Sequence, residues 1–118
     1  MRALPLSARA VGYLRHMLIS VQDDGNAQTT LAVAGELDVA TALELRGAGE
    51  QALADGAQSL VLDLSEVTFL DSSGLGALIA IRNAVLEAGR VLQLRQPSAR
   101  VNKVLELSGL TGVFDIQV

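Results

Sequence analysis

The alternation of apolar and polar residues predicts a pair of strands in the first third of the chain. Leu18–Gln22 has the composition of a short strand, and in Thr29–Leu37 the apolar residues fall on alternate positions. The turn-forming sequence at residues 23–26 joins them, so we expect an antiparallel hairpin. Gly35 interrupts the second strand near its end, where a bend or a close backbone approach is expected.

Helical and strand patterns then alternate to the end of the chain. The further predicted elements are helices over residues 41–54, 74–88 and 98–108 and strands over residues 60–64, 91–94 and 113–116. Thr41 and Glu44 form a capping-box pattern, and Ser98 is the expected N-cap of the third helix. The order β-β-α-β-α-β-α-β predicts one α/β domain with a mixed sheet of about five strands and parallel inner strands.

Residues 1–16 precede this pattern. They contain three arginines and no acidic residue, and Arg9 interrupts the apolar run that a secretory signal needs. We expect an N-terminal extension, either disordered or created by a start codon misassigned upstream of Met17; a transit-like segment is a further interpretation. The domain itself is then predicted to span residues 17–118.

Composition narrows the classes of function. Half of the 118 residues are apolar, which suffices for a single core. The net charge is −4 and no basic stripe is present, so nucleic acid is not an expected partner. No segment has the roughly 18–20 apolar residues of a membrane span, so we expect no membrane partner and a cytoplasmic location. The chain has no cysteine, which removes thiolate metal sites and cysteine nucleophiles.

Catalytic and metal-binding arrangements find little support. His16 is the only histidine and falls in the extension, and the segment before Ser72 lacks the first glycine of a nucleophile elbow. Asp38, Asp63 and Asp71 follow or end predicted strands, where they would either bind Mg²⁺ or remain solvated; solvated carboxylates are the simpler interpretation. No metal or cofactor is therefore predicted.

A nucleotide-binding turn is only partly present. Gly74-x-Gly76 stands at a helix start, but Ile79 occupies the third glycine position of the dinucleotide fingerprint. The P-loop pattern is absent. The same segment, Asp71-Ser72-Ser73-Gly74, places a carboxylate and two hydroxyls at a helix N-terminus, where any of them can cap free backbone N–H groups.

Four segments together resemble the anti-sigma factor antagonists, the bacterial STAS domains of partner-switching pathways. They are Gly35-Glu36-Leu37-Asp38, the strand Leu60-Val61-Leu62-Asp63-Leu64, the signature Phe69-Leu70-Asp71-Ser72-Ser73-Gly74-Leu75-Gly76, and the final helix with its turn over residues 97–110. The resemblance covers residues 17–118 and implies that this part is a STAS domain.

The resemblance implies that Ser72 is phosphorylated, because the family's acceptor serine directly follows the motif aspartate. It implies two partners, an anti-sigma factor with serine-kinase activity and a serine phosphatase. The unphosphorylated chain would bind the anti-sigma factor and release the sigma factor, and phosphorylation would end that binding. The chain itself would then be a regulator of transcription and not an enzyme.

The resemblance also implies a partner-binding surface around Ser72. Its expected residues are Asp38, Asp71, Ser73, Gly74, Leu75 and Gly76. Asp38 is expected beside Ser72, where it contacts the kinase, orients the hydroxyl or caps a strand end. Ser73 is expected to cap the helix rather than to accept a second phosphate. Gly74 and Gly76 are expected to admit the partner's backbone, whereas the helical stripe favours a core position for Leu75.

Two other functions remain open. The chain can be a STAS accessory domain of another pathway, for example of a transporter or another signalling complex, or a nucleotide-binding protein. The intact Asp71-Ser72-Ser73 sequence favours the antagonist, because relatives without phosphoswitching often lose the acceptor.

Overall fold

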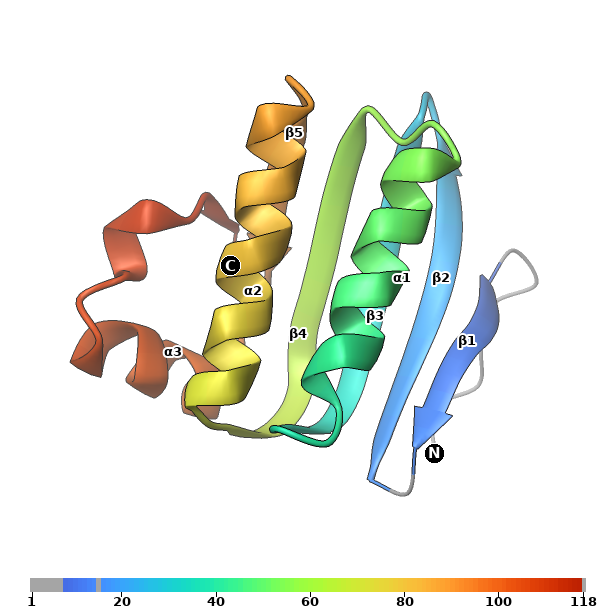
Figure 1. The fold of residues 1–118 in the computed structure, drawn as a ribbon. Helices are drawn as coiled ribbons and strands as arrows, with labels where there is room; N and C mark the ends of the chain where they lie inside the picture. The colour runs from blue at the N-terminus through green and yellow to red at the C-terminus, as the bar shows by residue number, and fades with distance from the viewer. Residues whose placement is uncertain (1–7, 15, 118) are drawn as a thin grey trace.

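The computed structural model describes residues 8–14 and 16–117, and the side chains of residues 16–117. Its strands are β1 (Ala8–Leu14), β2 (Met17–Gly25), β3 (Gln28–Leu37), β4 (Ser59–Leu70), β5 (Val91–Arg95) and β6 (Ile116–Gln117). Its helices are α1 (Ala42–Ala54), α2 (Ser72–Glu87), α3 (Ala99–Leu107) and the short 3₁₀ helix η1 (Thr111–Val113). The strands form one sheet in chain order, and α1 and α2 lie side by side against one of its faces (Figure 1).

The predicted topology is confirmed. β1, β2 and β3 are antiparallel neighbours, whereas β3, β4, β5 and β6 pair in parallel. The parallel strands are connected by α1, α2 and α3, as an α/β domain requires. One strand more than the expected five is present, because β1 extends the sheet at its outer edge.

Part of the expected N-terminal extension, Ala8–Leu14, forms a strand. These residues form β1 and pair with β2 from Ala8↔Gln22 to Leu14↔Met17, with a register shift between Ala10 and Gly12. Backbone hydrogen bonds to β2 hold these residues in the sheet. Such pairing leaves no pattern of apolar residues in the sequence, so hydrophobic periodicity does not predict it. For residues 1–7 the expectation lies outside the described residues.

The core lies between the sheet and the helices. Along β4 the side chains of Leu60, Leu62 and Leu64 are fully buried, and Leu31 pairs with Leu62 across the β3–β4 ladder. Helices α1, α2 and α3 add apolar side chains to the same cluster, namely Leu45 and Ala52, Ala77, Leu78, Ile81 and Val85, and Val101 and Leu105. Burial of these aliphatic groups is the main stabilising contribution, at roughly 25 cal/mol per Å² of apolar surface.

Gly35 allows the close backbone approach that the sequence predicts. Its φ is +108°, and a Cβ at this position would lie 2.1 Å from the carbonyl oxygen of His16. The next residue, Glu36, donates its N–H to that oxygen at 2.8 Å. The turn between β1 and β2 is thereby held against the end of β3.

Two predicted helix starts differ from the structure. Thr41 is fully buried, but its side chain does not cap α1; its hydroxyl donates to the carbonyl of Glu36 and accepts from the N–H of Asp38, each at 2.9 Å. The capping box with Glu44 is therefore wrong, because nearer backbone groups satisfy the hydroxyl. Helix α2 begins at Ser72, two residues before the predicted start.

Ser98 caps α3 as predicted and also ties that helix to the sheet. Its Oγ accepts the N–H of Val101 at 3.2 Å and donates to the carbonyl of Val67 in β4 at 2.7 Å. The start of α3 consequently lies beside the last third of β4.

The first turn of α2 packs directly on the end of β3, and Gly74 makes this possible. A Cβ on Gly74 would lie 2.4 Å from the carbonyl oxygen of Leu37 and 2.6 Å from Cδ1 of Leu70. Around Gly76, two residues on, nothing lies within 4 Å of the Cβ position.

This difference between two glycines of one helix gives a matched test. We expect Gly74→Ala to lower the free energy of unfolding by at least about 2 kcal/mol, because backbone blocks the new methyl group. We expect Gly76→Ala to raise it by about 0.5–1 kcal/mol, since alanine favours the helix. Urea unfolding followed by circular dichroism measures both, and equal effects of the two substitutions would contradict the packing described here.

Candidate functional site

The candidate site lies where β3 and β4 end side by side. Leu37 and Leu70, the last residues of the two strands, are paired, and the N–H of Asp71 donates to the carbonyl of Leu37 at 3.3 Å. Asp38 and Asp71 directly follow these paired residues, so the structure brings the two aspartates to the same edge. Helices α1 and α2 also begin at this edge (Figure 1).

Asp71 is the N-cap of α2. Its Oδ1 accepts the N–H groups of Ser73 at 2.9 Å and of Gly74 at 3.0 Å. These are two of the free donors at the helix start, and a negatively charged cap is further stabilised by the helix dipole. The expectation that Ser73 caps the helix is wrong, because the carboxylate of Asp71 takes this position.

Ser72 is the first residue of α2, and its side chain is exposed. Within residues 16–117 its hydroxyl makes no hydrogen bond. The cap therefore holds the backbone on both sides of Ser72 while the hydroxyl itself stays accessible from solvent. Such a group can accept a phosphoryl group from an external kinase without first breaking an internal hydrogen bond.

The other signature residues, Gly74, Leu75 and Gly76, differ in burial. Gly74 is buried and serves the packing of α2 on Leu37, so the structure does not support its expected role in admitting a partner. Gly76 is exposed with open space around it, which is compatible with that role. Leu75 is partly buried and packs against the core, as the helical stripe indicates.

Asp38 is held by its own loop. Its Oδ1 accepts the N–H of Ala40 at 2.9 Å, and its Oδ2 lies 3.3 Å from Nε2 of His16. The contact with His16 lacks hydrogen-bond geometry, so it acts through charge when the imidazole is protonated. Partial burial raises the pKa of the Asp38 carboxyl, but the Ala40 hydrogen bond, His16 and the Thr41 hydroxyl together hold that pKa below its ordinary value.

Sequence reasoning missed three residues at this edge. His16, assigned to the extension, lies beside Asp38 because Gly35 admits its backbone. Val39 and Leu43 are large apolar side chains that are 76% and 74% exposed. Val39 precedes α1, and Leu43 lies outside the apolar stripe of that helix. An apolar residue off the stripe was the available signal for Leu43.

The third aspartate considered for a metal site lies elsewhere. Asp63 is inside β4, seven residues before the end of that strand, and its Oδ1 accepts the N–H and the hydroxyl of Ser65. Among the residues whose side chains are described, no group of three or more histidine, aspartate or glutamate side chains is arranged to hold a metal ion. No helix in the described part is long and apolar enough to cross a membrane.

Comparisons with known proteins show the family and the fold of the chain. A family model described as "Mlab, STAS domain" matches residues 19–117. The chain belongs to the STAS domain family. An anti-sigma-B factor antagonist from Staphylococcus aureus (strain NCTC 8325 / PS 47) is 30% identical over 84 residues, which cover 71% of this chain and 78% of that protein.

Solved STAS structures are similar over most of the chain. An anti-sigma factor antagonist from Mycobacterium paratuberculosis has a TM-score of 0.73 at 27% identity and covers 98% of this chain and 90% of its own. The anti-sigma factor antagonist SpoIIAA in its unphosphorylated form has a TM-score of 0.71 at 23% identity, covering 85% of this chain and 88% of its own. The phosphorylated form of SpoIIAA, a Bacillus cell fate determinant, has a TM-score of 0.67 at 22% identity, covering 85% and 91%. The STAS fold predicted for this chain is confirmed.

The N-cap can be tested by separating its charge from its hydrogen bonds. We expect Asp71→Ala to lower the free energy of unfolding by about 1–2 kcal/mol, because two N–H groups lose their acceptor. Asp71→Asn keeps an acceptor at the same place and should change stability by no more than about 0.5 kcal/mol. Chemical unfolding measures both, and an equal loss in the two variants would show that the hydrogen bonds are not what Asp71 contributes.

The lowered pKa of Asp38 predicts a pH dependence of stability. Because that pKa is lower in the folded than in the unfolded protein, ionised Asp38 stabilises the fold fully above the unfolded value of about 4. This contribution is lost as the pH falls through the folded pKa. We therefore expect the stability advantage of the wild type over Asp38→Asn to shrink as the pH falls below about 4.

Acid titrations of unfolding free energy at fixed ionic strength make this measurement. The exposed Glu87 on α2 offers a control, Glu87→Gln. The difference in unfolding free energy between this variant and the wild type is not expected to shrink as the pH falls below about 4. A wild-type-to-Asp38→Asn difference that stays unchanged down to pH 3 would contradict the ionic role of Asp38.

Proposed function

We propose that this chain is an anti-sigma factor antagonist that is switched by phosphorylation at Ser72. The unphosphorylated form binds an anti-sigma factor with serine-kinase activity and releases the sigma factor. Transfer of the phosphoryl group to Ser72 ends this binding, and a separate serine phosphatase restores it. The chain acts in the cytoplasm as a binding module and does no catalysis itself.

The exposed, unbonded hydroxyl of Ser72 is the observation that carries the proposal. It stands at a helix N-terminus beside a capping aspartate, in a chain whose S. aureus relative is named an anti-sigma-B factor antagonist. SpoIIAA, with the same fold, is known in an unphosphorylated and a phosphorylated form. The STAS fold therefore tolerates both states.

The electrostatics of the site favour an effect on binding rather than on folding. A phosphoserine adds about −1.5 to −2 charges at pH 7. The positive end of α2 would stabilise this charge by about 0.3–1 kcal/mol, while the neighbouring carboxylates of Asp71 and Asp38 oppose it. These contributions to the stability of the phosphorylated chain partly cancel. A partner whose surface fits the unphosphorylated edge, however, loses affinity because a bulky dianion occupies the contact.

The partner surface proposed around Ser72 comprises Asp38, Asp71, Ser73, Leu75 and Gly76. Val39 and Leu43 extend it with exposed apolar area, which a partner can bury. Gly74 contributes indirectly, by holding α2 against β3. A nucleotide-binding function is less well supported, because the side chain of Asp71 already occupies the N–H groups of Ser73 and Gly74 that a phosphate would need.

The switch is tested with purified candidate anti-sigma serine kinases and ATP. We expect mass spectrometry to locate the phosphate on Ser72, and Ser72→Ala to bind the kinase whether or not ATP is present. Ser72→Asp should bind at least about tenfold more weakly, which corresponds to about 1.4 kcal/mol. Titration calorimetry measures the affinities.

Ser73→Ala is the matched control, since it removes the neighbouring hydroxyl and leaves Ser72 in place. Whatever its starting affinity, it should still be phosphorylated on Ser72 and should lose affinity for the kinase when phosphorylated. Phosphate on Ser73, or equal affinity of Ser72→Ala and Ser72→Asp for the partner, would contradict the proposed switch. Tight binding of ATP or GTP to the isolated chain would instead favour a nucleotide-binding protein.

A further inference from the structure

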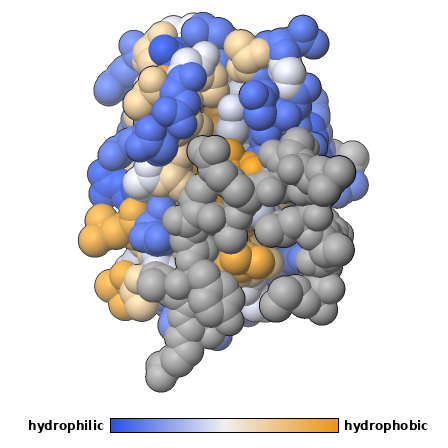
Figure 2. All heavy atoms as spheres, turned by 90° about the vertical axis from the view of Figure 1, so that its right-hand side faces the viewer, coloured by the Kyte–Doolittle hydropathy of each residue, from blue (hydrophilic) through white to orange (hydrophobic). Residues whose placement is uncertain are grey.

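A groove lies between α1 and the β2–β3 hairpin. Its volume is about 650 Å³, within the usual range for small-ligand sites of about 300–1,000 Å³. Figure 2 looks onto the sheet edge that carries β1 and β2, and there pale residues lie between two hydrophilic flanks in the upper part of the view. On the α1 side the groove is lined by the small residues Gly47, Ala48 and Ala52, whose side chains do not fill the space between the helix and β2.

The lining residues of α1 form one stripe. They are Glu44, Gly47, Ala48, Gln51, Ala52 and Asp55, which follow the spacing of a single helix face. At about 1.5 Å per residue, the stripe from Glu44 to Asp55 is roughly 16 Å long. The groove is therefore elongated and parallel to the helix axis.

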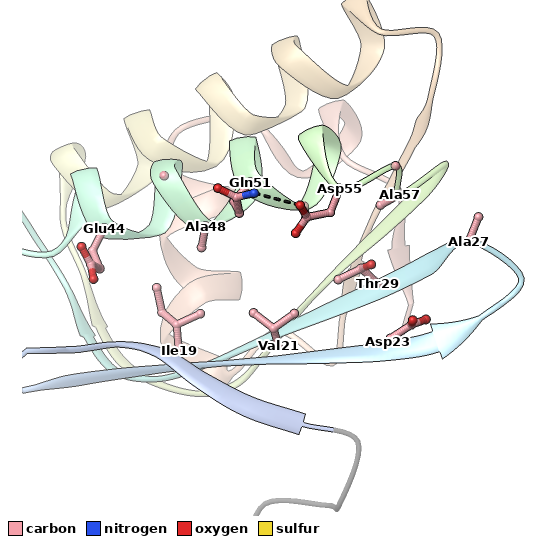
Figure 3. A pocket seen from close by; sticks show the side chains of 13 residues that line it. Ile19, Val21, Asp23, Ala27, Thr29, Glu44, Ala48, Gln51, Asp55 and Ala57 are labelled. Carbon is pink, nitrogen blue, oxygen red and sulfur yellow. Dashed lines mark hydrogen bonds between the residues drawn. The ribbon is translucent and has the colours of Figure 1, made fainter.

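The floor of the groove is apolar and its ends are acidic. Val21 of β2 and Ala48 of α1 are half-buried lining residues, and the fully buried Ile19 lies beneath them. Glu44 lies at one end of the groove, and Asp55 and Asp23 lie at the other (Figure 3). The charges are thus at opposite ends of a surface formed by Val21, Ala48 and the polar side chains of Thr29 and Gln51.

These carboxylates have no cationic partner among the residues whose side chains are described. Asp23 accepts the N–H of Gly25 at 3.0 Å, and Asp55 accepts from the side-chain amide of Gln51 at 2.9 Å. No lysine, arginine or histidine is among the described residues that line the groove. The two ends together offer acceptors for positive charge and nothing for an anion.

The strand at the floor does not favour a peptide occupant. β2 is hydrogen-bonded to β1 on one side and to β3 on the other, so its backbone has no free edge on which an added strand could pair. Strand addition is therefore excluded as a way of binding in this groove.

The geometry points to a binding site for a linear aliphatic polyamine. Its methylene segments would lie over Val21 and Ala48, and its inner ammonium groups would lie beside the side-chain oxygens of Thr29 and Gln51. One terminal ammonium group would lie at Glu44 and the other between Asp23 and Asp55. This ligand site is separate from the Ser72 edge, and it is independent of the phosphorylation switch proposed above. It would make the chain responsive to a small cationic metabolite.

The probe for the test is spermine, with putrescine and Mg²⁺ as comparison cations, in titration calorimetry at constant ionic strength. We expect spermine to bind with measurable heat, and putrescine and Mg²⁺ to bind at least about tenfold more weakly because neither spans both ends. Glu44→Gln and Asp55→Asn should each weaken spermine binding about threefold, as expected for an exposed ion pair. Glu50→Gln removes the same charge from an exposed position of α1 outside the groove and should leave the affinity unchanged.

Occupation of the groove itself needs a separate readout. Spermine should shift the methyl resonances of Ile19, Val21 and Ala48 in carbon–proton correlation spectra of the wild type, and leave those of Val101 in α3 in place. Ala48→Leu fills the groove and should abolish these shifts at Ile19 and Val21 while the dispersion of the spectrum shows a folded protein. Equal weakening by Glu50→Gln, equal affinity for Mg²⁺, or shifts spread evenly over the surface would each mean adventitious polycation binding and overturn the proposal.

Discussion

The contact between the first turn of α2 and the carbonyl of Leu37 determines where the candidate site residues lie. Leu37 and Leu70 are register partners at the ends of two parallel strands, and the N–H of Asp71 donates to the carbonyl of Leu37. Gly74 lets the following helix return onto this pair without a side chain between them. A larger residue would push α2 away from β3. Asp71 would then lose its position beneath the helix N-terminus, and Ser72 its fixed place at the sheet edge.

The capping geometry leaves both serine hydroxyls out of the helix cap, with Ser72 exposed and Ser73 half-buried. A carboxylate at Asp71 takes two N–H groups at once, so neither hydroxyl is needed as a cap. The first helical position then directs Ser72 outward, while Ser73 and Gly74 are held by their backbones. The helix start therefore leaves Ser72 more exposed than its neighbour Ser73.

Much of this could be predicted from the sequence, because apolar residues repeat with a period near two in strands and near 3.6 in helices. The element order, the Ser98 cap and the close approach at Gly35 followed from local patterns of this kind. The failures have a common cause, which is competition from groups distant in the chain. Thr41 bonds to the carbonyl of Glu36 instead of capping α1, and β1 is held by pairing with β2.

His16 illustrates why part of the site escaped prediction. Its neighbour Asp38 lies 22 positions further along the chain, and only the hairpin register together with the missing Cβ of Gly35 brings the two side chains within 3.3 Å. No local pattern encodes that meeting. Once Gly35 is known to have positive φ, however, the turn before β2 has to lie against the end of β3. Gly35 was therefore the signal in the sequence that another backbone segment approaches the end of β3 closely. The structure identifies that segment as the turn that contains His16.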